Sequence, residues 1–112
     1  MGPKITGSPA HRNGGLLEIT FDESDGPTSG SSSCCDETPG PDSPLPGILG
    51  PAGGRIGTVL LSPDIRGGTV STTSYDHHSS LASWESELGL PRLAEAATVP
   101  AVFGADVFTA AR

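Results

Sequence analysis

Two short apolar islands stand out from long polar stretches along this chain. The first, residues 16–21, reads Leu-Leu-Glu-Ile-Thr-Phe, and its β-branched and aromatic side chains predict a strand. The second, residues 58–61, reads Thr-Val-Leu-Leu and is followed by Ser62-Pro63. A continuous apolar run that ends at a proline is typical of a buried strand in a parallel sheet. We therefore expect two strands of a parallel sheet, and Glu18 indicates either that one face of the first strand is exposed to water or that this position has drifted.

One helix is expected to begin at Asp76, a residue type that caps helix N-termini well. Its apolar positions recur at i, i+3 and i+7, the spacing of a single helix face. These positions are Leu81, Trp84 and Leu88. A Gly-Leu-Pro sequence that starts at Gly89 then ends the helix.

The remaining segments complete an α/β pattern. Residues 69–73 are rich in β-branched side chains and are expected to be extended, and residues 102–108 form a short apolar tail that is a candidate for docking on the sheet. A strand, a long loop, a strand and a helix in this order predict an α/β fold.

The long loop covers residues 24–54, which are dominated by Gly, Pro and Ser and follow no strand or helix period. The whole chain has 16 Gly and 11 Pro among 112 residues, near the composition of low-complexity sequences. A loop of this length is either functional or disordered. Because the two islands give only a thin core, we expect the chain to be part of a domain.

The net charge of −7 and the isoelectric point near 4.6 argue against nucleic acid or an anionic membrane surface as a partner. No apolar run approaches the length of a membrane span. The first residues lack the apolar core of a signal peptide, so the chain expressed as it stands is expected in the cytoplasm.

The two cysteines, Cys34 and Cys35, are adjacent in the sequence. Two ligands cannot complete a structural zinc site, and the chain has no CxxC spacing. The pair could form a strained bridge, could bond to partners elsewhere, or could be two loop thiols without chemistry. The last interpretation is the plainest one, and the oxidation state stays open.

Candidate chemistry begins with Asp22 and Glu23, which directly follow the first predicted strand. Ligands of open α/β sheets bind beyond the carboxyl ends of the strands, and paired carboxylates suit a hard divalent cation. If the strands are parallel neighbours, the turn at residues 62–64 and His77 at the helix start would face this pair. Acidic groups and a histidine placed in this way can form a metal or phosphoryl site.

Each of these residues also has an ordinary structural interpretation. Most Asp-Glu pairs after a strand are solvated acids that open a loop, and His77 and His78 could simply cap or solvate the helix start. Ser79 and Ser80 lack the motif that frames a nucleophilic serine. The chain also contains no glycine-rich loop of the kind that cradles phosphates.

The order of motifs resembles the C-terminal part of the bacterial phosphoesterase family. The segments that carry the resemblance lie in order between residues 8 and 110 and include the Cys-Cys loop, which resembles that of secreted actinobacterial members. They are residues 13–25 (Asn-Gly-Gly-Leu-Leu-Glu-Ile-Thr-Phe-Asp-Glu-Ser-Asp), 53–63 (Gly-Gly-Arg-Ile-Gly-Thr-Val-Leu-Leu-Ser-Pro), 68–77 (Gly-Thr-Val-Ser-Thr-Thr-Ser-Tyr-Asp-His), 89–93 and 103–108.

The family includes acid phosphatases and non-specific phospholipases C of the alkaline-phosphatase-like superfamily. The resemblance implies a sheet sandwiched by helices and a metal-dependent hydrolase of phosphoric esters, with a phosphate ester as substrate. Asp22 and Glu23 would help to bind the divalent metal ion, and His77 would lie close to the site. Residues 8–110 would form the C-terminal portion of the domain, with residues 24–54 as a flexible loop within it.

The family's Ser or Thr nucleophile and its other metal ligands lie in an N-terminal half that these 112 residues do not contain. The resemblance therefore implies a portion of a domain that is inactive alone, from a protein of the cell envelope or secreted space. The chain departs from the family at Glu18, His78, Ser80 and residues 84–88, and these changes weaken packing. The alternative is a non-catalytic acidic module or the remnant of a pseudoenzyme.

Overall fold

The structure, a computed structural model, describes residues 2–24, 32–35, 39–41, 44 and 52–109. The chain divides into two compact units. The strand unit contains residues 1–21, 57–72 and 104–112, and the helix unit contains residues 22–56 and 73–103. Most of the loop expected at residues 24–54 lies outside the described residues, so its predicted flexibility stays a prediction.

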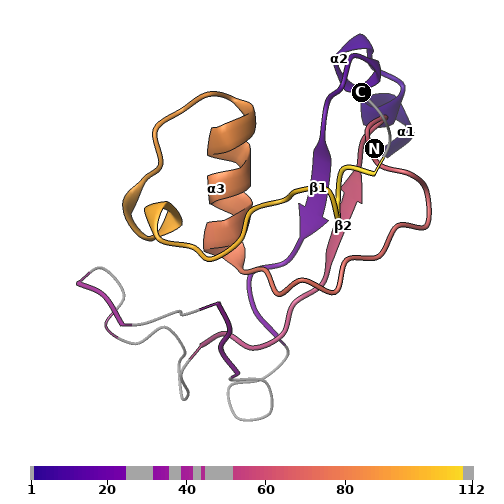
Figure 1. The fold of residues 1–112 in the computed structure, drawn as a ribbon. Coiled ribbons are helices and arrows are strands. Elements are labelled where there is room, and N and C mark those ends of the chain that lie inside the picture. Colours follow the sequence, from indigo (N-terminus) through magenta and orange to yellow (C-terminus); the bar gives the residue numbers. More distant parts are fainter. Residues whose placement is uncertain (1, 25–31, 36–38, 42–43, 45–51, 110–112) are drawn as a thin grey trace. The chain divides into compact units, whose positions relative to one another are not determined.

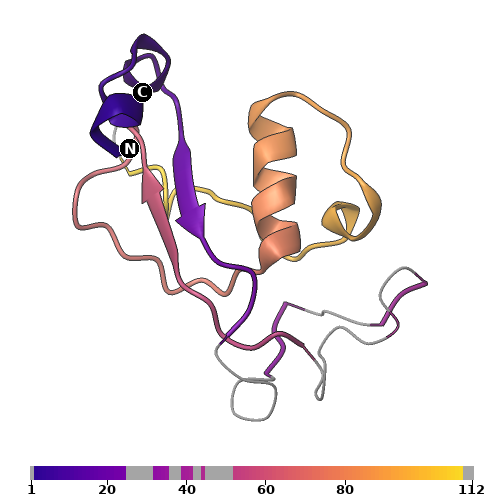
Figure 2. The ribbon, with the colours of Figure 1, turned by 180° about the vertical axis from the view of Figure 1, so that it is seen from behind.

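The strand unit contains a two-stranded sheet of β1 (Leu17–Thr20) and β2 (Thr58–Leu61). Both strands lie where the sequence predicts them. Their pairing is antiparallel, with Leu17 opposite Leu61 and Thr20 opposite Thr58 (Figures 1 and 2). The expected parallel pairing is wrong. A parallel pair needs a crossover connection, usually a helix, and no described residue between the two strands is helical.

One face of this sheet is apolar and uncovered. Residues directly opposite in a ladder share a face, as do alternate residues along a strand. The exposed fractions on this face are 53% for Ile19, 51% for Phe21, 54% for Val59 and 38% for Leu61. The expectation of buried strands is therefore wrong for this face. A sheet of two strands is marginally stable without further strands or a covering helix.

The first residues form two short helices that the sequence pattern does not predict, α1 (Gly2–Thr6) and α2 (Pro9–Arg12). Ser8 caps α2 by accepting a hydrogen bond from the His11 amide at 3.2 Å. Gly14 then turns the chain into β1 with a φ of +88°, a backbone conformation that favours glycine. Asn-Gly-Gly at residues 13–15 is a typical turn sequence, and the structure has a turn here.

The C-terminal tail is hydrogen-bonded to the loop that follows β2. The Arg66 amide donates to Thr109 Oγ1 at 2.9 Å, and the Ser71 hydroxyl donates to Asp106 Oδ2 at 2.5 Å. Val107 of the tail is buried, with 6% of its surface exposed. Residues 69–73 therefore form a docking loop for the tail and are not a strand.

The helix unit is built on α3 (His77–Glu87), and both of its ends are capped as predicted. Asp76 accepts a hydrogen bond from the Ser79 amide at 2.6 Å. At the other end, Gly89 has a φ of +65°, and the Leu90 amide donates to the Glu85 carbonyl oxygen at 2.8 Å. With the bond from the Gly89 amide to the Ser86 carbonyl, these contacts form a Schellman motif.

The face of α3 that is buried is different from the predicted one. Leu81 and Leu88 of the apolar stripe are 41% and 65% exposed. The buried residues of α3 are small or polar: Ser79, Ala82, Ser83 and Glu85. The predicted stripe therefore does not form the packed face of the helix.

Hydrogen bonds from the segment that follows α3 explain why this face of the helix is the buried one. The Phe103 amide donates to Ser83 Oγ at 2.9 Å, and the Leu93 amide donates to Glu85 Oε1 at 3.1 Å. The 3₁₀ helix η1 (Ala94–Ala97) packs against α3 and buries Ala96 completely. Small side chains let this backbone approach closely, and the polar ones accept hydrogen bonds from its amides.

Not all buried polar atoms of α3 have a hydrogen-bond partner among the described residues. Ser79 Oγ and Glu85 Oε2 are buried and have no hydrogen-bond partner among the described residues. A buried polar atom without a partner costs about 1–3 kcal/mol.

The described residues combine short helices with a two-stranded antiparallel sheet, and the larger sheet between helices stays a prediction.

Candidate functional site

The candidate site begins at the acidic turn, which we define as Asp22 and Glu23 after β1. Both side chains are exposed, and the Glu23 amide donates to Asp22 Oδ1 at 3.1 Å. The Ser24 amide donates to the Gly53 carbonyl oxygen at 2.9 Å. A Cβ at Gly53 would lie 3.4 Å from the Glu23 Cβ, so the two residues are in contact. The acidic turn is therefore held against Gly53, and its two acidic residues are exposed to solvent.

His77, the first residue of α3, contacts this turn within the helix unit. Its Nε2 lies 2.8 Å from the backbone carbonyl oxygen of Asp22. A carbonyl oxygen only accepts hydrogen bonds, so Nε2 carries the proton in this contact. In a neutral imidazole the lone pair is then on Nδ1, which can accept a proton or a hydrogen bond. The structure thus brings His77 to the acidic turn through the Asp22 backbone.

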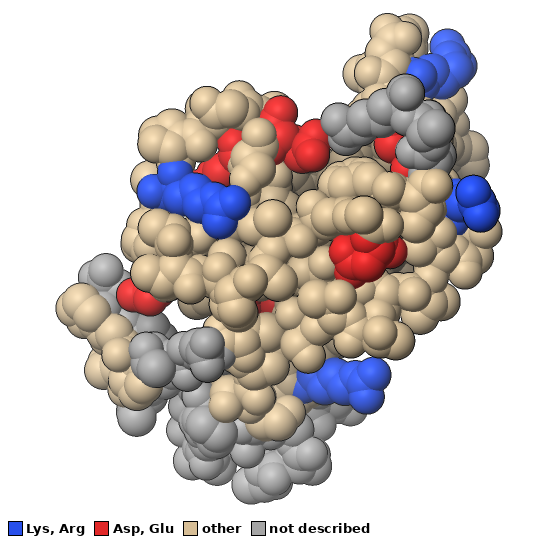
Figure 3. Space-filling model, in the orientation of Figure 1, with Lys and Arg blue, Asp and Glu red and all other residues tan. Residues whose placement is uncertain are grey.

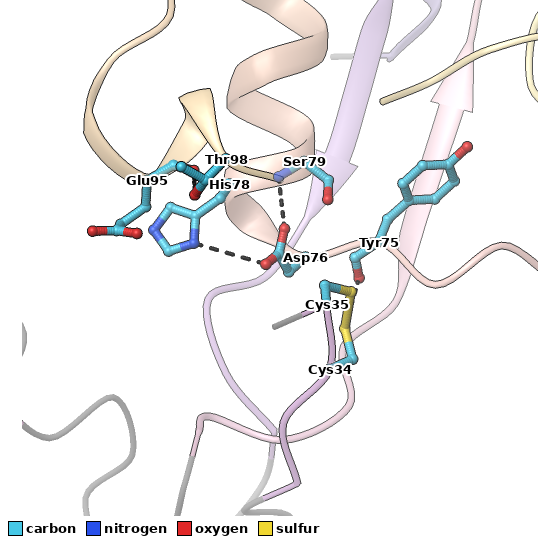
Figure 4. Close-up of polar contacts among 8 residues, drawn as sticks. All are labelled: Cys34, Cys35, Tyr75, Asp76, His78, Ser79, Glu95 and Thr98. Carbon is cyan, nitrogen blue, oxygen red and sulfur yellow. Dashed lines mark hydrogen bonds and ion pairs between the residues drawn. A yellow bond between two sulfur atoms is a disulfide. The ribbon is translucent and has the colours of Figure 1, made fainter. Parts of the chain in front are cut away.

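The neighbouring residues at the start of α3 have a capping role. His78 Nδ1 lies 3.7 Å from Asp76 Oδ2, and the other oxygen of Asp76 accepts the Ser79 amide (Figure 4). Both contacts favour the start of the helix, because Asp76 satisfies a backbone donor and lies near the positive end of the helix dipole. For His78, the structural interpretation of a residue that supports the helix start agrees with this geometry.

The turn at residues 62–64 lies elsewhere. Because β2 runs antiparallel to β1, the end of β2 lies beside the start of β1, whereas the acidic turn follows the end of β1. Asp64 Oδ2 lies 3.6 Å from the position that a Cβ would take at Gly14, just before β1. The prediction that this turn joins the acidic pair is wrong, for the same reason as the prediction of a parallel sheet.

Asp22 and Glu23 provide carboxylate oxygens of the type that hard divalent cations prefer. A complete cation site needs more donors than these. Within the described part of the chain, no group of three or more His, Cys, Asp or Glu side chains is placed to hold a metal ion. The donor set is therefore incomplete among the residues that the structure describes, and the sequence-based assignment of a metal to Asp22 and Glu23 stays a prediction.

Two features of the helix unit could not be derived from the sequence. Cys34 and Cys35 form a disulfide with each other. The sequence left three alternatives open for this pair, and the spacing of the cysteines could not decide among them. The contact of His77 with a backbone oxygen leaves no signal in the side-chain pattern.

On the face shown in Figure 3, basic side chains are separate spots among the acidic ones. The expectation that nucleic acid is not a partner still rests on net charge.

No helix in the described residues is both long enough and apolar enough to span a membrane.

The model of the phosphoesterase family matches residues 3–91, a range that contains both strands, the acidic turn and α3. No curated protein and no solved structure matches the chain. Since the family model covers most of the sequence, this chain belongs to the phosphoesterase family.

Proposed function

We propose that the chain is the C-terminal portion of a metal-dependent hydrolase of phosphoric esters and that the acidic turn supplies two of the metal ligands. Membership of the phosphoesterase family indicates hydrolysis of phosphoric esters in general. The observation that supports this site is the contact of His77 Nε2 with the Asp22 carbonyl oxygen at 2.8 Å. It brings an imidazole to the backbone of the turn that carries two solvent-exposed carboxylates, and metal-dependent phosphoryl chemistry uses groups of these types.

Each residue of the site has a defined part in this proposal. Asp22 and Glu23 would hold a divalent cation, which when bound supplies positive charge to stabilise the phosphoryl oxygens. His77 is oriented by its Nε2 hydrogen bond, so that Nδ1 is available to accept a proton or to orient a polar group of the ester. The Ser or Thr nucleophile and the other ligands would come from a segment outside the 112 residues.

The uncovered face of the sheet supports the idea that further polypeptide belongs to this domain. The strand unit leaves apolar surface uncovered at four residues, Ile19, Phe21, Val59 and Leu61. Exposed apolar patches of this kind mark surfaces that pack against another chain segment or protein. Additional strands or a helix of the same domain would bury this face and complete the sheet.

The test is hydrolysis of p-nitrophenyl phosphate and bis-p-nitrophenyl phosphate with added Mn²⁺, Zn²⁺ or Ca²⁺. The 112-residue chain alone is expected to show no turnover above buffer. A longer protein that joins an N-terminal half of the phosphoesterase family, with its nucleophile, to this chain is expected to be active, and Asp22→Asn is expected to lower its kcat by about 100-fold. Glu95→Gln is the matched control, because Glu95 is an exposed acid of the same unit. Full activity of the short chain would contradict the proposal.

Two observations favour a second candidate, a non-catalytic acidic module or pseudoenzyme remnant. The Asp22 carboxylate accepts a hydrogen bond from its own turn, and the described residues complete no metal site. This candidate predicts that the longer protein also fails to hydrolyse both esters. The same assay therefore separates the two functions.

We propose an extracellular or cell-envelope location on the basis of the family resemblance. The Cys34–Cys35 disulfide supports it, because disulfides persist mainly in oxidising compartments.

A further inference from the structure

The helix unit contains a disulfide between two residues that are neighbours in the sequence, Cys34 and Cys35. Cys35 has a φ of +64°, in the left-handed region that residues with a Cβ rarely adopt. The bond closes a small ring that includes the peptide between the two residues, and this ring restricts the backbone. Without the bond, the backbone of Cys35 would favour the ordinary extended or right-handed regions.

This ring lies against the start of α3 (Figure 4). Cys34 Sγ is 3.7 Å from the backbone carbonyl oxygen of Tyr75, the residue that precedes the N-cap Asp76. A disulfide sulfur carries no hydrogen, so this is a packing contact and not a hydrogen bond. Two residues before the ring, the Ser32 carbonyl oxygen accepts the Gly54 amide at 3.2 Å. The segment is thus attached to residue 54 and packed against the chain that enters α3.

We propose that the Cys34–Cys35 disulfide is a redox-sensitive latch on the start of α3. In the oxidised protein the ring holds Cys34 Sγ against Tyr75 and so restricts the backbone that leads to Asp76 and His77. In the reduced protein Cys35 leaves the left-handed region, the sulfur contact is lost, and the first turn of α3 opens more often. The latch acts on the helix start whatever the catalytic role of the chain, so its failure would leave the proposed hydrolase function untouched.

The reductant is a dithiol, either a small molecule or a protein. One of its thiolates attacks the Sγ of Cys34, which is an exposed residue, the bond between the two sulfurs breaks, and Cys35 leaves as a thiolate. The second thiolate of the reductant then attacks the mixed disulfide and releases the Cys34 thiolate. Two electrons pass from the dithiol to the cysteine pair, each cysteine thiolate takes up a proton, and the reductant becomes a cyclic disulfide.

The test is hydrogen–deuterium exchange of the full chain before and after reduction by dithiothreitol, with the gain of two hydrogen atoms checked by mass. The informative amides are those of Ser79 and Ser80, which donate to Asp76 Oδ1 and to the Asp76 carbonyl oxygen. Reduction is expected to speed their exchange by about tenfold, because protection reports local opening. Amides of the strand unit serve as the internal reference and should not change.

A double variant, Cys34→Ser with Cys35→Ser, provides the second arm. It is expected to show the fast exchange of the reduced protein with and without dithiothreitol. The proposal is overturned if Ser79 and Ser80 exchange equally fast in the oxidised and reduced wild-type chain, or if the double variant keeps the slow exchange of the oxidised protein.

Discussion

Replacement of Ala82 by leucine is expected to lower the free energy of unfolding of the helix unit by about 2 kcal/mol, because overpacking a filled site forces strained side chains and backbone shifts. Ala82 is a fully buried residue of α3. Urea unfolding monitored by the fluorescence of Trp84 reports on this unit, since Trp84 is the sole tryptophan and lies on α3.

The matched control changes the neighbouring residue on the same helix. Leu81→Ala removes a side chain that is 41% exposed, and alanine is the better helix former. We expect this change to alter the free energy of unfolding by less than about 0.5 kcal/mol, as is usual for substitutions at exposed sites. If Leu81→Ala proved severe and Ala82→Leu mild, the apolar stripe would be the packed face and the structure of this unit would be wrong.

Gly15→Ala is expected to destabilise the strand unit by about 2 kcal/mol, because the added methyl group would require a backbone shift. A Cβ at Gly15 would lie 2.7 Å from both the Ala10 carbonyl oxygen and the His11 Cα. Both atoms belong to the backbone of α2 and cannot move as a flexible side chain could. The measurement is exchange protection of the β1–β2 amides, which open with this unit.

Gly67→Ala controls for the general effect of losing a glycine in the strand unit. A Cβ at Gly67 would meet no atom within 4 Å, so we expect protection of the same amides to stay constant or to rise slightly. Equal loss of protection in both variants would show that steric contact at Gly15 is not the cause.

The sequence predicts the location of the strands but not their direction. The β-branched side chains of residues 17–20 and 58–61 favour extended backbone wherever the segment is placed. The direction of pairing depends on the connection, which lies in residues without periodicity. The turn at residues 62–64 was predicted beside the acidic turn because that prediction also assumed parallel strands. Antiparallel pairing puts this turn beside the start of β1.

The ends of α3 were predictable because caps depend on a few local residues, Asp76 at one end and Gly89 at the other. The buried face was not, because it is chosen by amides that return from distant residues 93 and 103. For the candidate site, the residue pattern and the resemblance both predict Asp22, Glu23 and His77, and that assignment stays a prediction. The contact between His77 and Asp22 runs through a backbone oxygen, which every residue has and which no side-chain pattern can reveal.

The most direct measurement is titration of the ¹⁵N-labelled chain with Mn²⁺, whose unpaired electrons broaden the signals of nearby amides. We expect the signals of Asp22, Glu23 and His77 to broaden first, and this effect to disappear in the double variant Asp22→Asn with Glu23→Gln. Broadening that instead begins at Glu87 or Glu95 and leaves the acidic turn and His77 sharp would contradict the claim that the acidic turn holds a cation beside the histidine.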